Sequence, residues 1–406
     1  MELRMGSFNL SSLPCMENLF EDTSVDVSVE VGDAAEVAEE TTEAAEVATD
    51  VQEDTAEASD TETTTELLFQ HIDTLINRKM YLETYGYDRR FAMLAAQDSI
   101  DYIRGGAPAV ESVNDVSSAN DSYTIAALEG VGDALKSAWE WIKKVLGKIA
   151  NWVGRFFRSV VMMFSSLENN IIRLKKLKSE RSWDSESAEK ASGDIPDDNI
   201  ETAMSEAISK NKEGSRVVTS DNWATVVDNL KTGFSDIKTL TTASLANKSS
   251  AEAAKTYAST DTYATESDKD KETSKKQREA HKKIVEELKK AADKKQSISN
   301  ATDKSVDDWL TLATKICKEK MALRNLGDSA ARDVSVAKKQ AEKYSALDSN
   351  DGKASSAVTK QFRNVTRYLS DLQSFSAKFC GALVKIANWL VKGAAKVLGA
   401  CYKKNK

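Results

Sequence analysis

The sequence predicts a mostly α-helical protein, with long amphipathic helices in an extended bundle behind a disordered acidic N-terminal segment. Only 17 Gly and 3 Pro occur in 406 residues, whereas sandwiches and doubly wound sheets need many turns. Apolar side chains recur every three or four residues through several long stretches, which is the helical period. The charge is divided: residues 1–129 hold 6 Lys and Arg against 28 Asp and Glu, and residues 130–406 hold 50 against 36.

The first part of the chain, residues 1–61, is an acidic low-complexity leader. It contains no Lys or Arg after Arg4 and consists mainly of Glu, Asp, Ala, Thr and Val. Such a segment repels itself and buries too little apolar area to offset the entropy of ordering. We therefore predict that residues 1–61 are disordered.

Residues 62–104 have the pattern of an αα-hairpin. A helical stripe runs from Leu67 to Leu82, and Tyr85-Gly86-Tyr87-Asp88 reads as a turn with Asp88 as the N-cap of a second helix. That helix is stopped by Gly105-Gly106-Ala107-Pro108. We expect residues 105–129 to be a polar linker and residues 130–406 to form a basic helical bundle.

Residues 131–178 predict a long, basic, Trp-rich amphipathic helix. Apolar residues from Leu135 to Leu174 recur at helical spacing and define one buried stripe. The opposite face is cationic and carries Lys136, Lys143, Lys144, Lys148, Arg155, Arg158, Arg173, Lys175, Lys176 and Lys178, against three carboxylates, Asp133, Glu140 and Glu168.

Such a helix has three physical uses: packing in a bundle, lying on an anionic membrane, or placing cations along nucleic acid or another polyanion. The Trp side chains Trp139, Trp141, Trp152 and Trp389 also fit an interfacial anchor. The candidate face for an anionic partner or a membrane consists of Lys143, Lys144, Lys148, Arg155, Arg158, Trp152, Lys385, Trp389, Lys392 and Lys396.

The remaining stretches predict further helices at 198–210, 221–246, 269–296, 303–347 and 355–402. The stretch 303–347 begins at an Asp303 or Ser305 cap, and the stretch 355–402 keeps a three-four alternation typical of bundle packing. Lys148-Ile149-Ala150-Asn151-Trp152 recurs as Lys385-Ile386-Ala387-Asn388-Trp389. Similar surroundings are expected for the two repeats, such as those of an antiparallel pair formed by their helices.

The sequence offers no recognisable catalytic chemistry. It contains no HExxH motif, P-loop, strand-borne GxGxxG or GxSxG elbow. Of the two histidines, His71 is expected to be structural and His281 to be solvated on a charged helix. The four cysteines are far apart, so reduced buried thiols are expected rather than a zinc site or a disulfide framework. We predict a non-enzymatic protein with no catalytic residue, cofactor or metal.

No secretory signal or membrane-spanning helix is expected. A basic segment followed by an apolar core is absent from the N-terminus. The most apolar run, from Cys380 to Cys401, is interrupted by Lys385, Lys392 and Lys396, so it falls short of about 18 uninterrupted apolar residues.

Tripeptides with a small residue two positions before a Glu occur through the acidic third of the chain. They end at Glu30, Glu36, Glu46, Glu111 and Glu129, and the last of them, Ala127-Leu128-Glu129, stands at the change in charge sign and is followed by Gly130. In this layout of acidic leader, small-X-Glu sites and basic helical body, the whole chain resembles the internal head proteins of large tailed bacteriophages.

The resemblance implies a precursor whose leader targets it to the prohead core. A phage maturation protease would cut after such Glu residues, with Glu129, Glu111, Glu46 and Glu30 as the candidate sites. The basic remainder would stay with packaged DNA in the capsid interior or be ejected with it. Capsid and core proteins and the maturation protease are the implied partners, and the host cytoplasm is the implied location during assembly.

Charge gives this layout a physical reason. The uncut leader would screen the basic body, and a cut at Glu129 would remove a net charge of −22 and leave a body of +14. Two other readings remain open. A membrane-active protein would lay residues 131–164 and 376–402 on a host bilayer, and a plain helical scaffold would use its basic faces only for solubility and associate with itself through its helices.

Overall fold

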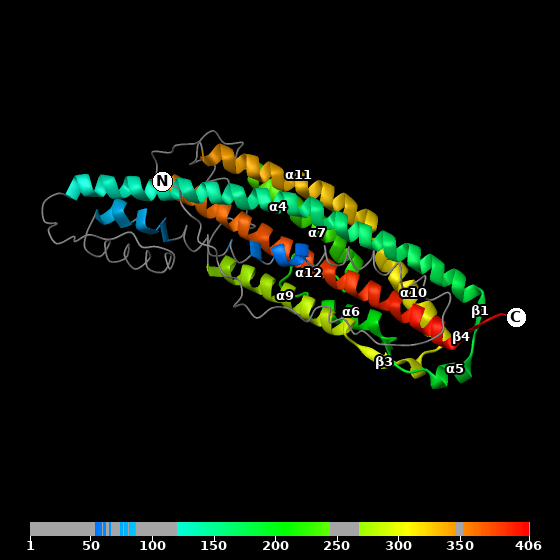
Figure 1. Ribbon diagram of the computed structural model, residues 1–406. Coiled ribbons are helices and arrows are strands. Elements are labelled where there is room, and N and C mark those ends of the chain that lie inside the picture. Colours follow the sequence, from blue (N-terminus) through cyan, green and yellow to red (C-terminus); the bar gives the residue numbers. More distant parts are fainter. Residues whose placement is uncertain are drawn as a thin grey trace, which may run out of the picture.

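The computed structural model describes residues 120–243, 268–345 and 352–405, together with residues 53–58, 60, 61, 65, 74, 75, 77–79 and 81–86. The described chain is dominated by helices lying side by side in an elongated bundle (Figure 1), as the sequence predicts. Residues 1–52 of the predicted leader and the predicted second helix of the hairpin lie outside the described residues.

Two long helices set the length of the bundle. Helix α4 spans Asn120–Ser179 and helix α12 spans Gly352–Cys401. Each is followed by a three-residue strand, β1 (Arg181–Trp183) after α4 and β4 (Tyr402–Lys404) after α12, and these strands pair with Arg181 opposite Lys404. The C-terminal ends of α4 and α12 therefore meet at one end of the molecule, and the helices run in the same direction (Figure 1).

This direction corrects the expectation of an antiparallel pair. Trp152 precedes the end of α4 by 27 residues, and Trp389 precedes the end of α12 by 12 residues. With the two ends level, the repeated motifs are offset by about 22 Å along the bundle, at about 1.5 Å per residue. Helical periodicity records which face of a helix is buried, and it carries no information on which neighbour covers that face.

Helix α12 is the central element of the bundle. It contacts α4, α7 (Trp223–Ala243), α9 (Asp268–Ala292) and α10 (Asp303–Lys318), and every residue from 368 to 377 is buried. Helix α11 (Lys320–Ser345) covers α4 and α7. The smaller elements lie toward the β1–β4 end: α5 (Ser185–Lys190), β2 (Asp194–Pro196) paired with β3 (Lys295–Ser297), α6 (Ile200–Ser209) and the 3-10 turn Ile298–Asn300.

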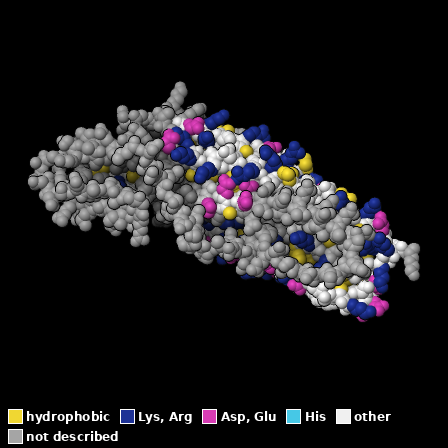
Figure 2. Space-filling view, viewed as in Figure 1, with side chains coloured by type: hydrophobic (Ala, Val, Ile, Leu, Met, Phe, Trp, Pro, Cys, Tyr) yellow, Lys and Arg dark blue, Asp and Glu magenta, His cyan; other side chains and the backbone are white. Residues whose placement is uncertain are grey.

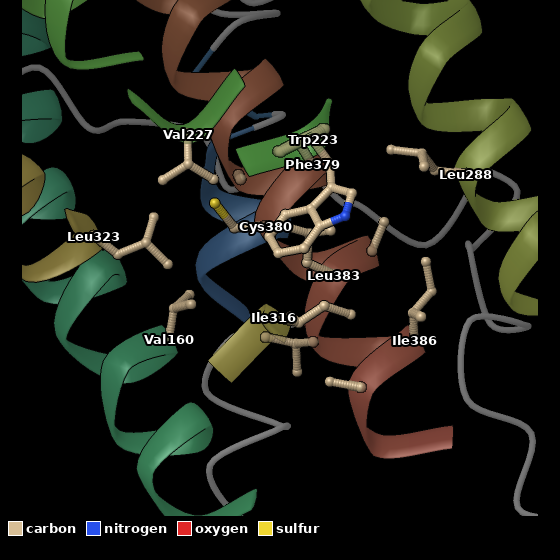
Figure 3. Close-up of a cluster of buried hydrophobic side chains, with 14 of the residues drawn as sticks. Val160, Trp223, Val227, Leu288, Ile316, Leu323, Phe379, Cys380, Leu383 and Ile386 are labelled. Atoms are coloured by element: carbon tan, nitrogen blue, oxygen red, sulfur yellow. The ribbon is translucent and has the colours of Figure 1, made fainter. Parts of the chain in front are cut away.

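The core is built from the apolar stripes of all the long helices. Figure 3 shows side chains converging from α4 (Val160), α7 (Val227), α10 (Ile316), α11 (Leu323) and α12 (Leu383). Each such side chain contributes roughly 1.5–3 kcal/mol when it leaves water. Of the three uses considered for residues 131–178, packing in a bundle is thus confirmed for the apolar face of this helix from Ile142 onward.

Several helix boundaries differ from the predicted ones. Helix α4 begins at Asn120, so residues 120–129 of the predicted linker are helical, in keeping with the strong helix formers Ala126, Ala127 and Leu128. The predicted helix 303–347 is divided at Glu319 into α10 and α11. Its cap is Thr302, whose side chain accepts the Ser305 N–H in a capping box, rather than Asp303 or Ser305.

Part of the predicted disordered leader is folded. Residues 53–58, 60 and 61 are helical, and Ala58 is fully buried. The charge of this segment favours disorder on its own, but the basic body supplies a partner for it. In the predicted hairpin, residues 74–79 and 81–85 are helical where they are described.

Candidate polyanion-binding face

Cations line the outward side of α4. Between residues 144 and 162 the exposed side chains recur every three or four residues, and none of the exposed side chains between residues 144 and 176 is a carboxylate. We call the exposed cations on this side the α4 stripe: Lys144, Lys148, Arg155, Arg158, Arg173 and Lys176. At about 1.5 Å per residue the stripe is about 48 Å long.

The apolar period of α4 is what turns these cations outward. Ile149, Phe156 and Val160 are fully buried against the bundle, so residues about half a turn away along the helix face solvent. Glu168, the carboxylate within this stretch, is ion-paired with Lys320 of α11. In Figure 2, Lys and Arg side chains recur along the edge of the molecule where Figure 1 places α4 and α11.

The predicted cations differ in their partners. Lys143 pairs with Glu140 of the same helix. Within the described part of the chain, Lys148, Arg158 and Lys176 have no ion-pair partner. These three are the cations of the stripe that are most available to an external anion.

The lysines of α12 form a separate and more occupied group. Lys385 Nζ lies 2.7 Å from Asp293 Oδ1 at the end of α9, and Lys396 Nζ lies 3.4 Å from the Asp194 carbonyl oxygen. Lys392 is exposed. The prediction placed these lysines beside those of α4 as one candidate face, but two of the three already have partners in the bundle.

Trp152 does not lie on the exposed cationic surface. Trp152 is 1% exposed and stacks on Phe156 with ring centroids 4.6 Å apart. Trp389 is partly buried against the core. Including Trp152 in an exposed anion- or membrane-facing surface was therefore wrong, because its large apolar ring fills the core between helices. The side chains of Trp139 and Trp141 lie outside the described part of α4.

The folded leader segment meets the α4 stripe at Arg155. Arg155 Nε donates to Asp54 Oδ1 at 2.8 Å, and its Nη2 pairs with Glu57. The hydrogen bond to Asp54 is the main reason that the pKa of Arg155 is raised. Trp152 Nε1 donates to the Asp54 carbonyl oxygen at 2.7 Å. Acidic leader and basic body are thus in direct contact.

Sequence reasoning missed Asp54 and Glu57 as partners. A signal was present, because Asp54, Ala58, Thr61 and Thr65 follow a helical spacing of i, i+4, i+7 and i+11. This face of the leader helix is made of small and polar residues, so a search for large apolar side chains does not detect it.

The candidate cleavage residues lie in different parts of the chain. Glu129 is inside α4 and is its tenth residue. Glu111, Glu46 and Glu30 lie outside the described residues. A protease that binds extended backbone would require the first turns of α4 to open locally before cutting at Glu129.

A buried polar cluster joins α9, α12 and the loop of residues 210–222. His281 of α9 is 3% exposed and stacks on Phe375 with ring centroids 4.0 Å apart. Its Nε2 lies 3.0 Å from Ser215 Oγ, and its Nδ1 lies 3.3 Å from Asp371 Oδ2 of α12. The prediction of a solvated His281 was wrong, because the ring faces the seam between α9 and α12 while its neighbours Lys282 and Lys283 face water.

The order Ser–His–Asp is that of a hydrolytic triad, but the surroundings favour a structural network. Ser215 Oγ accepts the Val218 N–H at 3.0 Å and so stabilises its own turn. Gln277 Nε2 also donates to Asp371 Oδ2, at 3.3 Å. The cluster links the 210–222 loop to α9 through the Ser215–His281 hydrogen bond, and α9 to α12 through the Gln277–Asp371 hydrogen bond. His281 Nδ1 and Gln277 Oε1 are buried and have no hydrogen-bond partner among the described residues.

The cysteines, possible metal-binding groups and possible membrane-spanning helices also bear on function. Cys317, Cys380 and Cys401 are free and buried, as expected, and burial raises the pKa of Cys317 and Cys380 to about 12. Within the described residues, no group of side chains is arranged to hold a metal ion. Among the described helices, none has the length and apolar character needed to cross a membrane.

Comparison with known families supports the resemblance seen in the layout. The family of phiKZ-like phage internal head proteins matches residues 25–182. No curated protein and no solved structure matches this chain. The matched range contains Asp54, Glu57, Trp152 and Arg155, and it ends within β1 just after α4. The match covers residues 25–182, less than half of the chain, and shows that this stretch is similar to the internal head proteins of these phages.

Proposed function

We propose that this chain is a structural protein located inside a phage head, that it is made as an acidic precursor, that its leader is cut away after Glu129, and that the α4 stripe then binds packaged DNA. The single observation that carries the proposal is the stripe: six exposed cations over about 48 Å with no exposed carboxylate between them. Nucleic acid offers the matching partner, a line of phosphates with one charge per about 1.7 Å of duplex.

The leader contact supports the order of events. Asp54 and Glu57 occupy Arg155, which lies within the stripe. Residues 1–129 also carry a net charge of −22 on the same chain as the +14 body. Removing these residues takes away both a local competitor for Arg155 and a long-range repulsion of phosphates.

A structural rather than enzymatic role is part of the proposal. The polar side chains that are buried together, around His281, are held by hydrogen bonds to neighbouring elements. The rival reading as a membrane-active protein receives less support, because Trp152 and the apolar faces of α4 and α12 are already covered by the bundle.

The test is DNA binding by variants of the chain from which the leader has been removed. Replacing Lys148, Arg158 and Lys176 by Ala should lower the slope of log affinity against log salt by about 0.9 for each cation that contacts a phosphate. The matched control replaces Lys190, Lys210 and Lys290, each of which is ion-paired with a Glu on its own helix. Equal slopes for the two triple variants would contradict the assignment to the α4 stripe.

A further inference from the structure

The leader segment is docked between two helices through a face made of small residues. Its buried positions are Asp54, Ala58, Thr61 and Thr65, whereas Glu53, Ala56 and Asp60 are exposed. The hydroxyls of Thr61 and Thr65 donate to the carbonyl oxygens of Glu57 and Thr61, at 2.8 and 2.6 Å. Because these hydroxyls are satisfied within their own helix, the face can be buried without unpaired polar groups.

One wall of the docking site is α4. There the leader backbone accepts the Trp152 indole N–H through the Asp54 carbonyl, and the Asp54 side chain, which is 5% exposed as a residue, accepts from Arg155. A buried carboxylate is costly unless it is paired. Arg155 therefore selects an acidic residue at this position of whatever helix docks here.

The other wall is α12, at Gly381. The nearest described atom to a Cβ placed on Gly381 would be Thr55 Oγ1, 3.7 Å away. In Figure 3 the blue ribbon of the leader segment passes beside α12 next to Cys380. Gly381 thus leaves the space that the docked helix fills, and a large side chain there would meet the leader first.

We propose that the groove between Trp152 and Arg155 of α4 and Gly381 of α12 is a binding site for an acidic helix with a small-residue face, and that residues 53–65 of the same chain are its occupant. This deepens the proposed function and rests on it. A chain break near Glu129 would leave the leader bound without a covalent link. Unmasking of Arg155 then needs a second step, the undocking of the helix.

The charged groups of the site indicate that salt and competing anions control undocking. The pairs of Arg155 with Asp54 and Glu57 are partly exposed, since 54% of the Arg155 side chain is accessible, so salt weakens them. A competing polyanion acts on the same guanidinium. DNA and the leader helix therefore exclude each other at Arg155, and dense phosphate would favour release of a cut leader.

The test uses the full chain with a protease recognition sequence placed within residues 105–119, and the variant Gly381→Leu. Leu at Gly381 should fill the leader's space and gain helix propensity. The matched control is Gly399→Leu on the same helix, where no described atom lies within 4 Å of the added Cβ. Amide hydrogen exchange of residues 53–65 is measured before cutting, and co-elution of the leader fragment is measured after cutting at about 0.1 M salt.

We expect residues 53–58 to be protected in the unmodified and Gly399→Leu chains, and protection to fall about tenfold or more in Gly381→Leu with α12 itself unchanged. The cut leader should co-elute with the body in the first two chains and separate in the third. Unprotected residues 53–58 in the unmodified chain, or immediate separation of its cut leader, would overturn the proposal. A leader supplied by a second copy, seen as a dimer that Gly381→Leu dissociates, would also overturn it. If the leader docks in the groove but its removal does not change DNA binding, the proposed function would be contradicted and the assignment of the groove would be retained.

Discussion

Single residues with buried polar groups decide how firmly the elements of this bundle are joined. His281 is such a residue, because Ser215, Asp371 and the ring of Phe375 all meet its imidazole at the seam of α9 and α12. Sequence alone placed it on a charged surface, since the residues beside it are lysines. The flanking charges describe the opposite face of the helix.

His281→Ala should destabilise the protein by about 2–4 kcal/mol, because it leaves a cavity against Phe375 and removes the hydrogen-bond partner of Ser215 Oγ. Urea unfolding measures the change. Lys282→Ala, the exposed neighbour on α9, should change stability by less than about 0.5 kcal/mol. If His281 instead serves a nucleophile, a fluorophosphonate probe would label Ser215; we expect no label and a clear loss of stability.

Tyr402 is a second such residue, at the end where α4 and α12 meet. Its hydroxyl donates to Asp303 Oδ1, and Lys178 Nζ lies 2.9 Å from the same oxygen. Burial, and then the hydrogen bond to Asp303, raises the pKa of Tyr402. The hydrogen bond from Tyr402 lowers the pKa of Asp303. The contact between β4 and the start of α10 thus depends on a protonated phenol and an ionised carboxylate.

The pH dependence follows from these directions. A raised folded-state pKa contributes stability that is complete below the unfolded tyrosine pKa of about 10 and is lost as pH rises above it. Tyr402→Phe should cost about 1–2 kcal/mol at pH 7 and should show a smaller loss of stability between pH 9 and 11. Unfolding free energies of both chains at these pH values provide the measurement. Parallel decline in the two chains would refute the role of this hydroxyl.

At the scale of elements, α4 and α11 pack closely at Gly327. A Cβ on Gly327 would lie 2.8 Å from Phe157 Cβ, whereas one on Gly154, across the same interface, would lie 3.8 Å from Ala331 Cβ. Gly327 is therefore required by the neighbouring backbone, and Phe157 cannot withdraw because its Cβ is fixed by its own helix.

Gly327→Ala should destabilise the bundle by about 1–3 kcal/mol through overpacking, despite the gain of about 1 kcal/mol in helix propensity. Gly399→Ala, where the added methyl meets no described atom, should be neutral or stabilising. Thermal unfolding of the pair gives the comparison. A stabilised Gly327→Ala chain would mean that α4 and α11 are not packed as described.

Helices were predicted from the sequence wherever apolar residues recur at helical spacing over a long stretch. The helices at 198–210, 221–246 and 269–296 correspond to α6, α7 and α9. The break at Glu319 escaped prediction because apolar residues continue on both sides of it, at Ile316, Cys317 and Leu323. The folded leader segment escaped because Ala58, Thr61 and Thr65 bury little apolar area, and their stability comes from partners about a hundred residues away.

The candidate site was predicted in part, namely where its residues follow from the helical period of α4. Lys148, Arg158 and the rest of the α4 stripe followed from the helical period, since burying one face of α4 exposes the other. Trp152 was misplaced because an amphipathic ring suits a membrane surface and a core equally well by sequence. The pairing of Lys385 with Asp293 joins residues 92 positions apart, which periodicity within one helix does not reveal.

At the scale of the whole molecule, opposite charges are kept on one chain and brought into contact. The matched family range of residues 25–182 includes residues 25–61 of the acidic leader, the change of sign and the whole of α4. Within it, Asp54 and Arg155 are 101 positions apart and form the contact that connects leader and body. Long-range attraction between the two parts favours this contact, and their separation favours binding of a polyanion.

The most direct measurement compares DNA affinity as a function of salt for the full chain and for the same chain after cutting within residues 105–119 and removing the leader at high salt. The account predicts weak binding by the full chain, and tighter binding with a steeper salt dependence once the leader is gone. Equal affinities and equal salt dependence for the two forms would contradict it.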